Sequence, residues 1–336
     1  MKNKISLDTA ATSNTELENN ILGDIKISKK YSLIDLSNKF DVSPAKIELA
    51  VKSLVEKGHN LEYTIDNKLE ISKDIPKQSP LVIDTKDYFG NDWIRFGVVA
   101  DTHLVSKYAR LDVLNALYDV FHKEGIQTVL HGGNWIDGEA RFNKYDILCS
   151  GIENQVKYFI DNYPKREGMK TKIISGDDHE GWYVQREGIN IGKIMQDRAR
   201  QAGRNDLIDL GYMERDLIFK KGKGQSSIRV MHAGGGSTYA ISYTSQKYVE
   251  SLQGGDKPTL AVVGHFHKFD WAYPREVNVL QPGATQDQTP FMRKKRIQSM
   301  VGGCILEIKQ DSQGNFIRNK VEWIPFYDKK HYEYKM

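Results

Sequence analysis

Residues 95–103 read Arg-Phe-Gly-Val-Val-Ala-Asp-Thr-His, an apolar and β-branched run that ends in a carboxylate and an imidazole. The run has the composition of a buried strand. Asp101 and His103 stand two residues apart at its end, so both side chains can turn toward one edge of a sheet. Together they offer a divalent cation an oxygen and a nitrogen ligand. By itself an Asp-x-His pair is a weak signal, because it often arises by chance.

Four more polar clusters follow apolar runs of the same kind. They are Gly133-Asn134-Trp-Ile-Asp137 after Thr-Val-Leu-His, Asp178-His179-Glu180 after Lys-Ile-Ile-Ser, His232 after Ile-Arg-Val-Met, and Gly264-His265-Phe-His267 after Leu-Ala-Val-Val. The ends of strands at one edge of a sheet can converge on one site. Taken singly, His232 could be a core or loop histidine, and His265 and His267 could be surface histidines. Taken together, the five clusters predict one metal site.

The clusters lie in a part of the chain where strands and helices alternate, which predicts an α/β fold with helices on both faces of the sheets. The amphipathic stretches are Leu111 to Lys123, Ile147 to Asn162, Ile191 to Ala202 and Ser242 to Leu252.

The order of the clusters resembles that of the calcineurin-like metallophosphoesterase superfamily, over about Trp93 to Phe326. Within it, the chain is similar to the phage and bacterial branch of DNA-repair-exonuclease-like proteins. The resemblance implies a two-sheet β-sandwich flanked by helices, with two divalent ions about 3.5 to 4 Å apart at the strand ends. Mn²⁺ is the expected ion, with Fe, Zn or Mg as alternatives.

The resemblance also implies a role for each candidate residue. The first ion would be held by Asp101, His103 and His267, and the second ion by Asp178, His232 and His265. Asn134 would bridge the two ions. His179 matches the family's histidine that contacts the phosphate and can protonate the leaving oxygen.

Two positions depart from the family pattern. The bridging position is ordinarily aspartate, but here it is Asn134, and the position before the motif histidine is ordinarily asparagine, but here it is Asp178. One carboxylate has therefore moved from the bridge to the second ion, and a neutral amide is the poorer bridge. Asp177 is a rival ligand because the motif is one residue longer than usual. The asparagine could also mark an inactive enzyme.

The amino-terminal part predicts a separate small domain, which resembles a winged helix over residues 21–75. It contains a helix through Leu33 and Phe40, a second helix from Pro44 to about Lys57 capped by Ser43, and a hairpin over residues 61–72. A mobile tail is expected over residues 1–20, a linker over residues 76–92, and the metallophosphoesterase domain over residues 93–336.

The winged helix predicts DNA binding through its second helix, with Lys46 and Lys52 as candidate contacts. No arginine precedes Arg95, so a protein-contact or spacer module is the alternative. The formal net charge of +4 permits a polyanionic substrate without requiring one. Cys149 and Cys304 are the only cysteines, so any metal must be held by oxygen and imidazole.

These features favour a nuclease or phosphodiesterase that acts on DNA, in repair or in phage DNA metabolism. Candidate substrate contacts are Arg293, Lys294 and Arg296, and candidate stacking residues are Trp135, Trp182, Tyr183, Tyr239, Tyr243 and Phe266. The alternatives are a phosphomonoesterase of the protein-phosphatase kind, a small-nucleotide phosphodiesterase, or an inactive scaffold. A location in the cytoplasm (that of the host if a phage encodes the chain), no membrane contact and a homodimer are further expectations.

Overall fold

The structure is a computed structural model, and it describes residues 7–27, 30–72, 78–84, 93–236 and 240–326. The chain divides into two compact units. The larger unit comprises Pro76–Trp182 and Met195–Met336, and the smaller comprises Met1–Ile75 and Tyr183–Ile194. No helix in the described part of the chain is both long and apolar enough to span a bilayer.

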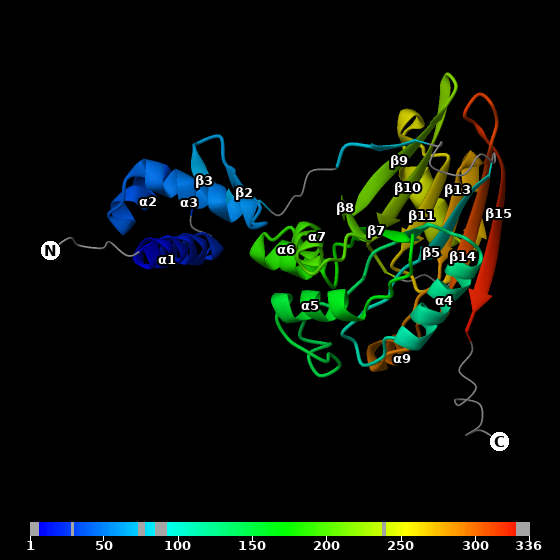
Figure 1. Ribbon diagram of the computed structural model, residues 1–336, viewed down its shortest axis with the longest axis horizontal. Helices are drawn as coiled ribbons and strands as arrows, with labels where there is room; N and C mark the ends of the chain where they lie inside the picture. The colour runs from blue at the N-terminus through cyan, green and yellow to red at the C-terminus, as the bar shows by residue number, and fades with distance from the viewer. Residues whose placement is uncertain (1–6, 28–29, 73–77, 85–92, 237–239, 327–336) are drawn as a thin grey trace. The chain divides into compact units, whose positions relative to one another are not determined.

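The larger unit is built on two six-stranded sheets (Figure 1). In spatial order, the first contains β12 (Phe269–Ala272), β13 (Asn278–Pro282), β11 (Leu260–Gly264), β10 (Gly224–His232), β9 (Glu214–Lys221) and β4 (Leu81–Asp84). The second contains β15 (Phe316–Pro325), β14 (Gly302–Gln310), β5 (Trp93–Val99), β6 (Thr128–His131), β7 (Lys170–Ser175) and β8 (Leu207–Tyr212).

One hydrophobic core joins the two sheets. Phe96 from β5 and Phe219 from β9 meet edge to face at 5.9 Å between ring centroids. The same core contains side chains of β6, β7, β8, β10, β11, β13 and β14. Two sheets that share one buried layer form a sandwich, and helices flank it, which confirms the predicted fold class.

Parallel pairing sets where the strands end. Strands β5, β6, β7 and β8 run parallel to one another, as do β10, β11 and β13. Each parallel group therefore presents the carboxyl ends of its strands at one edge. The polar clusters predicted from the sequence lie at these ends.

The helices that follow β5 along the chain are α4 (Leu111–Lys123), α5 (Ile152–Asn162), α6 (Gly181–Glu187), α7 (Ile191–Gln201), α8 (Tyr243–Ser251) and α9 (Pro290–Lys295), with short 3-10 turns η2 (Gly254–Asp256) and η3 (Pro274–Glu276). Most of α6 and the start of α7 fall within Tyr183–Ile194, which belongs to the smaller unit. The prediction for Leu111 to Lys123 is confirmed, and α4 packs close to the sheet because Gly97 leaves room for the Phe121 ring. The prediction of a helix from Ile147 was wrong at its start. Gly151, with φ of 85°, separates α5 from the turn before it.

The predicted linker over residues 76–92 contains a strand. Leu81–Asp84 forms β4 and pairs in parallel with β9, Leu81 opposite Leu217. Ile83 is buried in the core. The three apolar residues 81–83 therefore add an edge strand to the sandwich, and the remaining described linker residues, 78–80, carry no regular structure.

The smaller unit contains the helices and the hairpin expected from the sequence. They are α2 (Leu33–Phe40), α3 (Pro44–Glu56), and a sheet in the order β1 (Tyr31–Ser32), β3 (Lys68–Ile71), β2 (Leu61–Tyr63). Ser43 caps α3 by accepting a hydrogen bond from the Lys46 backbone N–H, as predicted.

The prediction of a mobile tail over residues 1–20 is wrong for residues 7–20, which belong to helix α1 (Leu7–Lys26). Four apolar side chains on one face are buried against α2 and α3, namely Leu17, Ile21, Leu22 and Ile25. Burial of this apolar face stabilises a helix whose other residues are mostly polar. The buried Glu18 also pairs with Lys57, the residue that caps the carboxyl end of α3.

Candidate metal centre

The carboxyl ends of β5, β6, β7, β10 and β11 meet at one place between the two sheets. Gly132, after β6, and Gly264, at the end of β11, lie so close that a Cβ on Gly264 would come within 2.0 Å of the Gly132 carbonyl oxygen. His232 bridges the same gap, because its Nδ1 lies 2.7 Å from that oxygen. Glycine is therefore required at position 264, and a side chain at position 132 would also be tight, with its Cβ 3.0 Å from the Ala100 Cβ.

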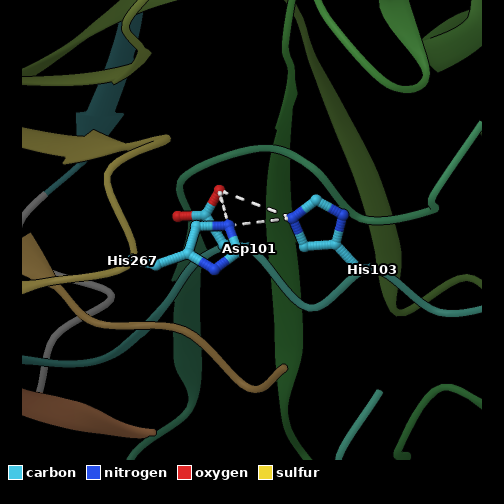
Figure 2. Close-up of side chains that lie close together, drawn as sticks. All are labelled: Asp101, His103 and His267. Atoms are coloured by element: carbon cyan, nitrogen blue, oxygen red, sulfur yellow. Dashed lines mark hydrogen bonds and ion pairs between the residues drawn. The ribbon is translucent and has the colours of Figure 1, made fainter. Parts of the chain in front are cut away.

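The first cluster consists of Asp101, His103 and His267, all buried (Figure 2). The Nε2 atoms of the two histidines lie 3.1 Å apart, and the Asp101 Oδ1 atom lies 3.6 Å from that of His267 and 4.0 Å from that of His103. Burial and the neighbouring imidazoles lower the pKa of His103 and of His267. Both rings are thus neutral, which is the form that binds a metal ion.

The second cluster places one carboxylate between two imidazoles. Asp178 Oδ1 lies 3.1 Å from His232 Nε2, and Asp178 Oδ2 lies 3.1 Å from His265 Nδ1. Burial disfavours the charged form of His232, but Asp178 outweighs it and raises the pKa of His232 to about 10, so an ion bound at this ring must displace a proton. Among the described residues, Asp177 belongs to none of the groups of side chains that could hold a metal ion.

Asn134 has a buried amide oxygen, Oδ1, with no hydrogen-bond partner among the described residues. Its backbone, in contrast, is fully engaged. The N–H donates to Glu180 Oε1 at 3.0 Å, and the carbonyl accepts the His103 N–H at 2.8 Å. The Glu180 carboxylate also accepts the Gly176 N–H at 2.9 Å, so it ties the loop after β6 to the loop after β7. A buried acceptor left without a donor is costly unless a cation or water occupies the position.

Asp137 links the first cluster to His179. Its Oδ1 lies 2.9 Å from His103 Nδ1 and 3.3 Å from His179 Nδ1, and its backbone carbonyl accepts a hydrogen bond from His179 Nδ1 at 2.9 Å. These three residues could also hold an ion by their spacing, but the hydrogen bonds satisfy them internally. Burial opposes protonation of His179, yet Asp137 and Asp178 outweigh it and raise the pKa of His179 to about 9. The sequence placed Asp137 in a cluster without indicating this role.

The backbone of the site lies in an unusual region of conformational space. Of the eight candidate metal-binding and catalytic residues, six have positive φ angles, namely Asp101 (50°), His103 (44°), Asn134 (52°), His179 (47°), His265 (93°) and His267 (53°). Residues other than glycine avoid this region, and each such conformation costs about 1 to 3 kcal/mol. The surrounding hydrogen bonds hold the side chains in place against that cost.

A cavity of 870 Å³ adjoins the clusters. His103, Asn134, Asp178 and His179 line it, and so does Arg296 at the end of α9. Arg293 and Lys294, the other predicted substrate contacts, are exposed on α9 but do not line this cavity. Lys46 and Lys52 lie on α3 in the smaller unit, the first half-buried and the second exposed.

Two of the six predicted stacking residues line the cavity. Trp135 and Tyr183 are buried and serve packing, and Tyr243 is half-exposed but does not line the cavity. Trp182 and Phe266 line the cavity. Tyr239 lies outside the described residues. The sequence analysis did not identify the cavity residues Phe142 and Phe291, because no short motif marks them, whereas Lys295, which also lines the cavity, belongs to the basic run 293–296.

No family model matches the sequence, and no curated protein matches it. The chain is similar to several solved structures. They include an archaeal phosphodiesterase (13% identity, 69% of this chain and 100% of that chain, TM-score 0.34), Vps29 with zinc from Entamoeba histolytica (14%, 70% and 100%, 0.32) and a putative 5′-nucleotidase from Staphylococcus aureus (13%, 72% and 57%, 0.38).

Proposed function

We propose that the larger unit is a phosphoesterase that uses two divalent metal ions to hydrolyse phosphodiester bonds, with DNA as its substrate. The observation that carries this proposal is the pair of convergent clusters at one sandwich edge, with the orphaned Asn134 oxygen beside them. Asp101, His103 and His267 would hold one ion, and the ligands of the other would be Asp178, His232 and His265. Asn134 would contribute its amide oxygen to both ions.

The donor set fits a divalent transition metal. It combines imidazole nitrogens with carboxylate and amide oxygens, a mixture suited to Mn²⁺, Fe²⁺ or Zn²⁺. Second contacts orient the rings: Asp137 holds Nδ1 of His103, and the Gly132 carbonyl holds Nδ1 of His232, so that each ring turns Nε2 toward its cluster. Manganese is the ion we propose.

When bound, a pair of such ions supplies Lewis-acid activation of water and neutralises charge on the phosphate. His179 supplies the proton to the departing alcohol oxygen. Its Nδ1 donates to Asp137, which leaves Nε2 as the atom that can reach the leaving group. The Asp137 carboxylate raises the pKa of His179, which favours the protonated ring that a general acid requires.

Metal removal and addition test the proposal. We expect the chelated protein to be inactive, and added Mn²⁺ to raise its melting temperature and to start hydrolysis of labelled single- or double-stranded DNA. His267→Ala should lose both responses, whereas the exposed His122→Ala on α4 should keep them. Parallel assays with Mg²⁺, Zn²⁺ and Fe²⁺ identify the ion. A wild-type protein that binds none of these ions and leaves every DNA form intact would refute the proposal.

We also propose that the smaller unit is a winged-helix module that binds duplex DNA, with Lys46 and Lys52 on phosphates. The order helix, turn, helix, hairpin supports this. Because each neutralised phosphate releases a counterion, Lys46→Ala/Lys52→Ala should weaken duplex binding and lower the slope of log affinity against log salt by about 2. The measurement is fluorescence anisotropy over a salt series. The control is Lys123→Ala/Lys157→Ala, which removes the same charge from the larger unit. An equal loss of duplex affinity in both double variants would count against DNA binding by the smaller unit.

A further inference from the structure

Three aromatic side chains form a continuous surface along one wall of the cavity, beginning at His179. Trp182 lies 4.7 Å from the His179 ring at 31°, and Phe142 meets Trp182 edge to face at 5.4 Å. Phe291 then stacks on Phe142 at 4.9 Å and 28°. Trp182, Phe142 and Phe291 are called the aromatic shelf. All three line the cavity that adjoins the two clusters.

Two members of the shelf, Phe142 and Phe291, are exposed although they are large and apolar, and Trp182 is half-buried. Phe142 is 50% exposed and Phe291 is 41% exposed, and the two come from different parts of the chain. Leaving two phenyl rings in water forgoes the free energy of their burial. Exposed apolar surface that borders a pocket is characteristic of a ligand-binding surface.

The shelf is held in position by its neighbours. Asn143, next to Phe142, is buried and donates through Nδ2 to the Asp137 carbonyl at 2.9 Å. On the other side, α9 is capped by Thr289, whose hydroxyl accepts the Met292 N–H at 3.2 Å, and the Met292 side chain is buried. The two rings therefore stand on anchored backbone, which lowers the entropic cost of binding a ligand.

Two cations lie beside the shelf. Lys295 and Arg296 line the same cavity, are exposed, and form no ion pair with a described residue. A ligand that matches this wall has a phosphate at the metal clusters, a flat π surface a short distance away, and further negative charge. A nucleotide within a strand, or a nucleotide ester, has this combination.

We propose that the aromatic shelf stacks an unpaired nucleobase next to the phosphodiester that is cleaved, and that Lys295 and Arg296 contact the adjoining phosphate. The shelf thereby adds base recognition to the proposed phosphoesterase. That a phosphodiester is cleaved beside the stacked base rests on the proposed function. Stacking uses the π face that all bases share, so recognition is tolerant of sequence. Because a paired base inside a duplex has no free face, single strands and frayed ends are preferred over intact duplex.

The test compares two esters that share a leaving group and differ in the nucleoside, which only the first carries: thymidine 5′-(4-nitrophenyl) phosphate and methyl 4-nitrophenyl phosphate. For Phe142→Ala and Phe291→Ala, we expect kcat/KM on the thymidine ester to fall by about 5-fold to 100-fold, and kcat/KM on the methyl ester to stay unchanged. Phe142→Tyr and Phe291→Tyr should retain activity on both, because tyrosine stacks equally well. Tyr273→Ala, an exposed aromatic outside the cavity, is the matched control.

A second measurement does not depend on turnover. Binding of fluorescent oligothymidine and of an abasic oligomer of equal charge is followed by anisotropy in EDTA, and the two alanine variants should weaken only the first. If the wild-type protein hydrolyses neither ester, the proposed function fails while this binding assay still decides the shelf. If the alanine variants weaken oligothymidine binding but keep kcat/KM on the thymidine ester, the shelf binds a base within a DNA strand. If they also lower kcat/KM on the thymidine ester, the shelf binds the bases of small nucleotides too. Equal losses on base-containing and base-free ligands, or no loss, overturn the inference.

Discussion

His179→Ala lowers kcat for phosphodiester hydrolysis by about 10² to 10⁴-fold while both metal ions stay bound. The expectation follows from the ring's position: its Nδ1 bonds to Asp137 and it lies outside both three-residue clusters that we assign to the ions. The loss should be larger for a substrate with an alkyl leaving group than for a nitrophenyl ester, because nitrophenolate departs without help from an acid.

The measurement combines steady-state kinetics on the two esters with elemental analysis of the purified variants. His122→Ala removes an exposed histidine from the same unit and should match the wild-type protein in rate and in metal content. A variant at His179 that loses an ion together with its activity would show instead that His103, Asp137 and His179 act as a ligand group.

Asp178→Ala removes one of the two ions and lowers kcat/KM on the order of 10³-fold. Asp178 is the single carboxylate of its cluster and lies 3.1 Å from a nitrogen of His232 and of His265. Without it, two imidazoles and the Asn134 amide remain, a set with no negative charge to offset a divalent cation. The readouts are metal stoichiometry by elemental analysis and the rate on a DNA substrate.

Asp177→Ala is the matched control for this prediction. It deletes the same chemical group one residue earlier, in the position that the sequence leaves open as a rival ligand. We expect it to keep two ions and most of the activity. If Asp177→Ala loses the ion and Asp178→Ala keeps it, the second ion is held by the other aspartate and the assignment of the cluster must change.

The sequence predicted the strands of the site because local composition determines them. The β-branched runs before Asp101, Asn134, Asp178, His232 and His265 all form strands or strand ends at one edge of the sandwich. Each apolar run and the polar cluster that follows it are local features of the sequence, so they can be recognised without knowledge of distant contacts. Whether the eight candidate residues act as the family pattern implies stays a prediction.

Features that depend on tertiary contacts could not be predicted from the sequence. Helix α1 is mostly polar and forms because one narrow face, including Ile21, packs against other helices. Strand β4 is four residues long and gains its hydrogen bonds from β9, which lies more than a hundred residues later. The aromatic shelf joins Phe142 to Phe291 across a similar separation. No local pattern carries such information, because the partner supplies the stabilising contact.

The positive φ angles at six candidate residues bear on how the chain can evolve. Glycine adopts these angles without strain, so replacing Asp101, His103 or Asn134 by glycine would relieve backbone strain and abolish a ligand at the same step. A lineage released from catalysis would therefore drift toward glycine at these positions first. Some descendants of this chain would keep residues other than glycine at these six positions. Those descendants are the ones in which selection still maintains the metal-binding and catalytic side chains.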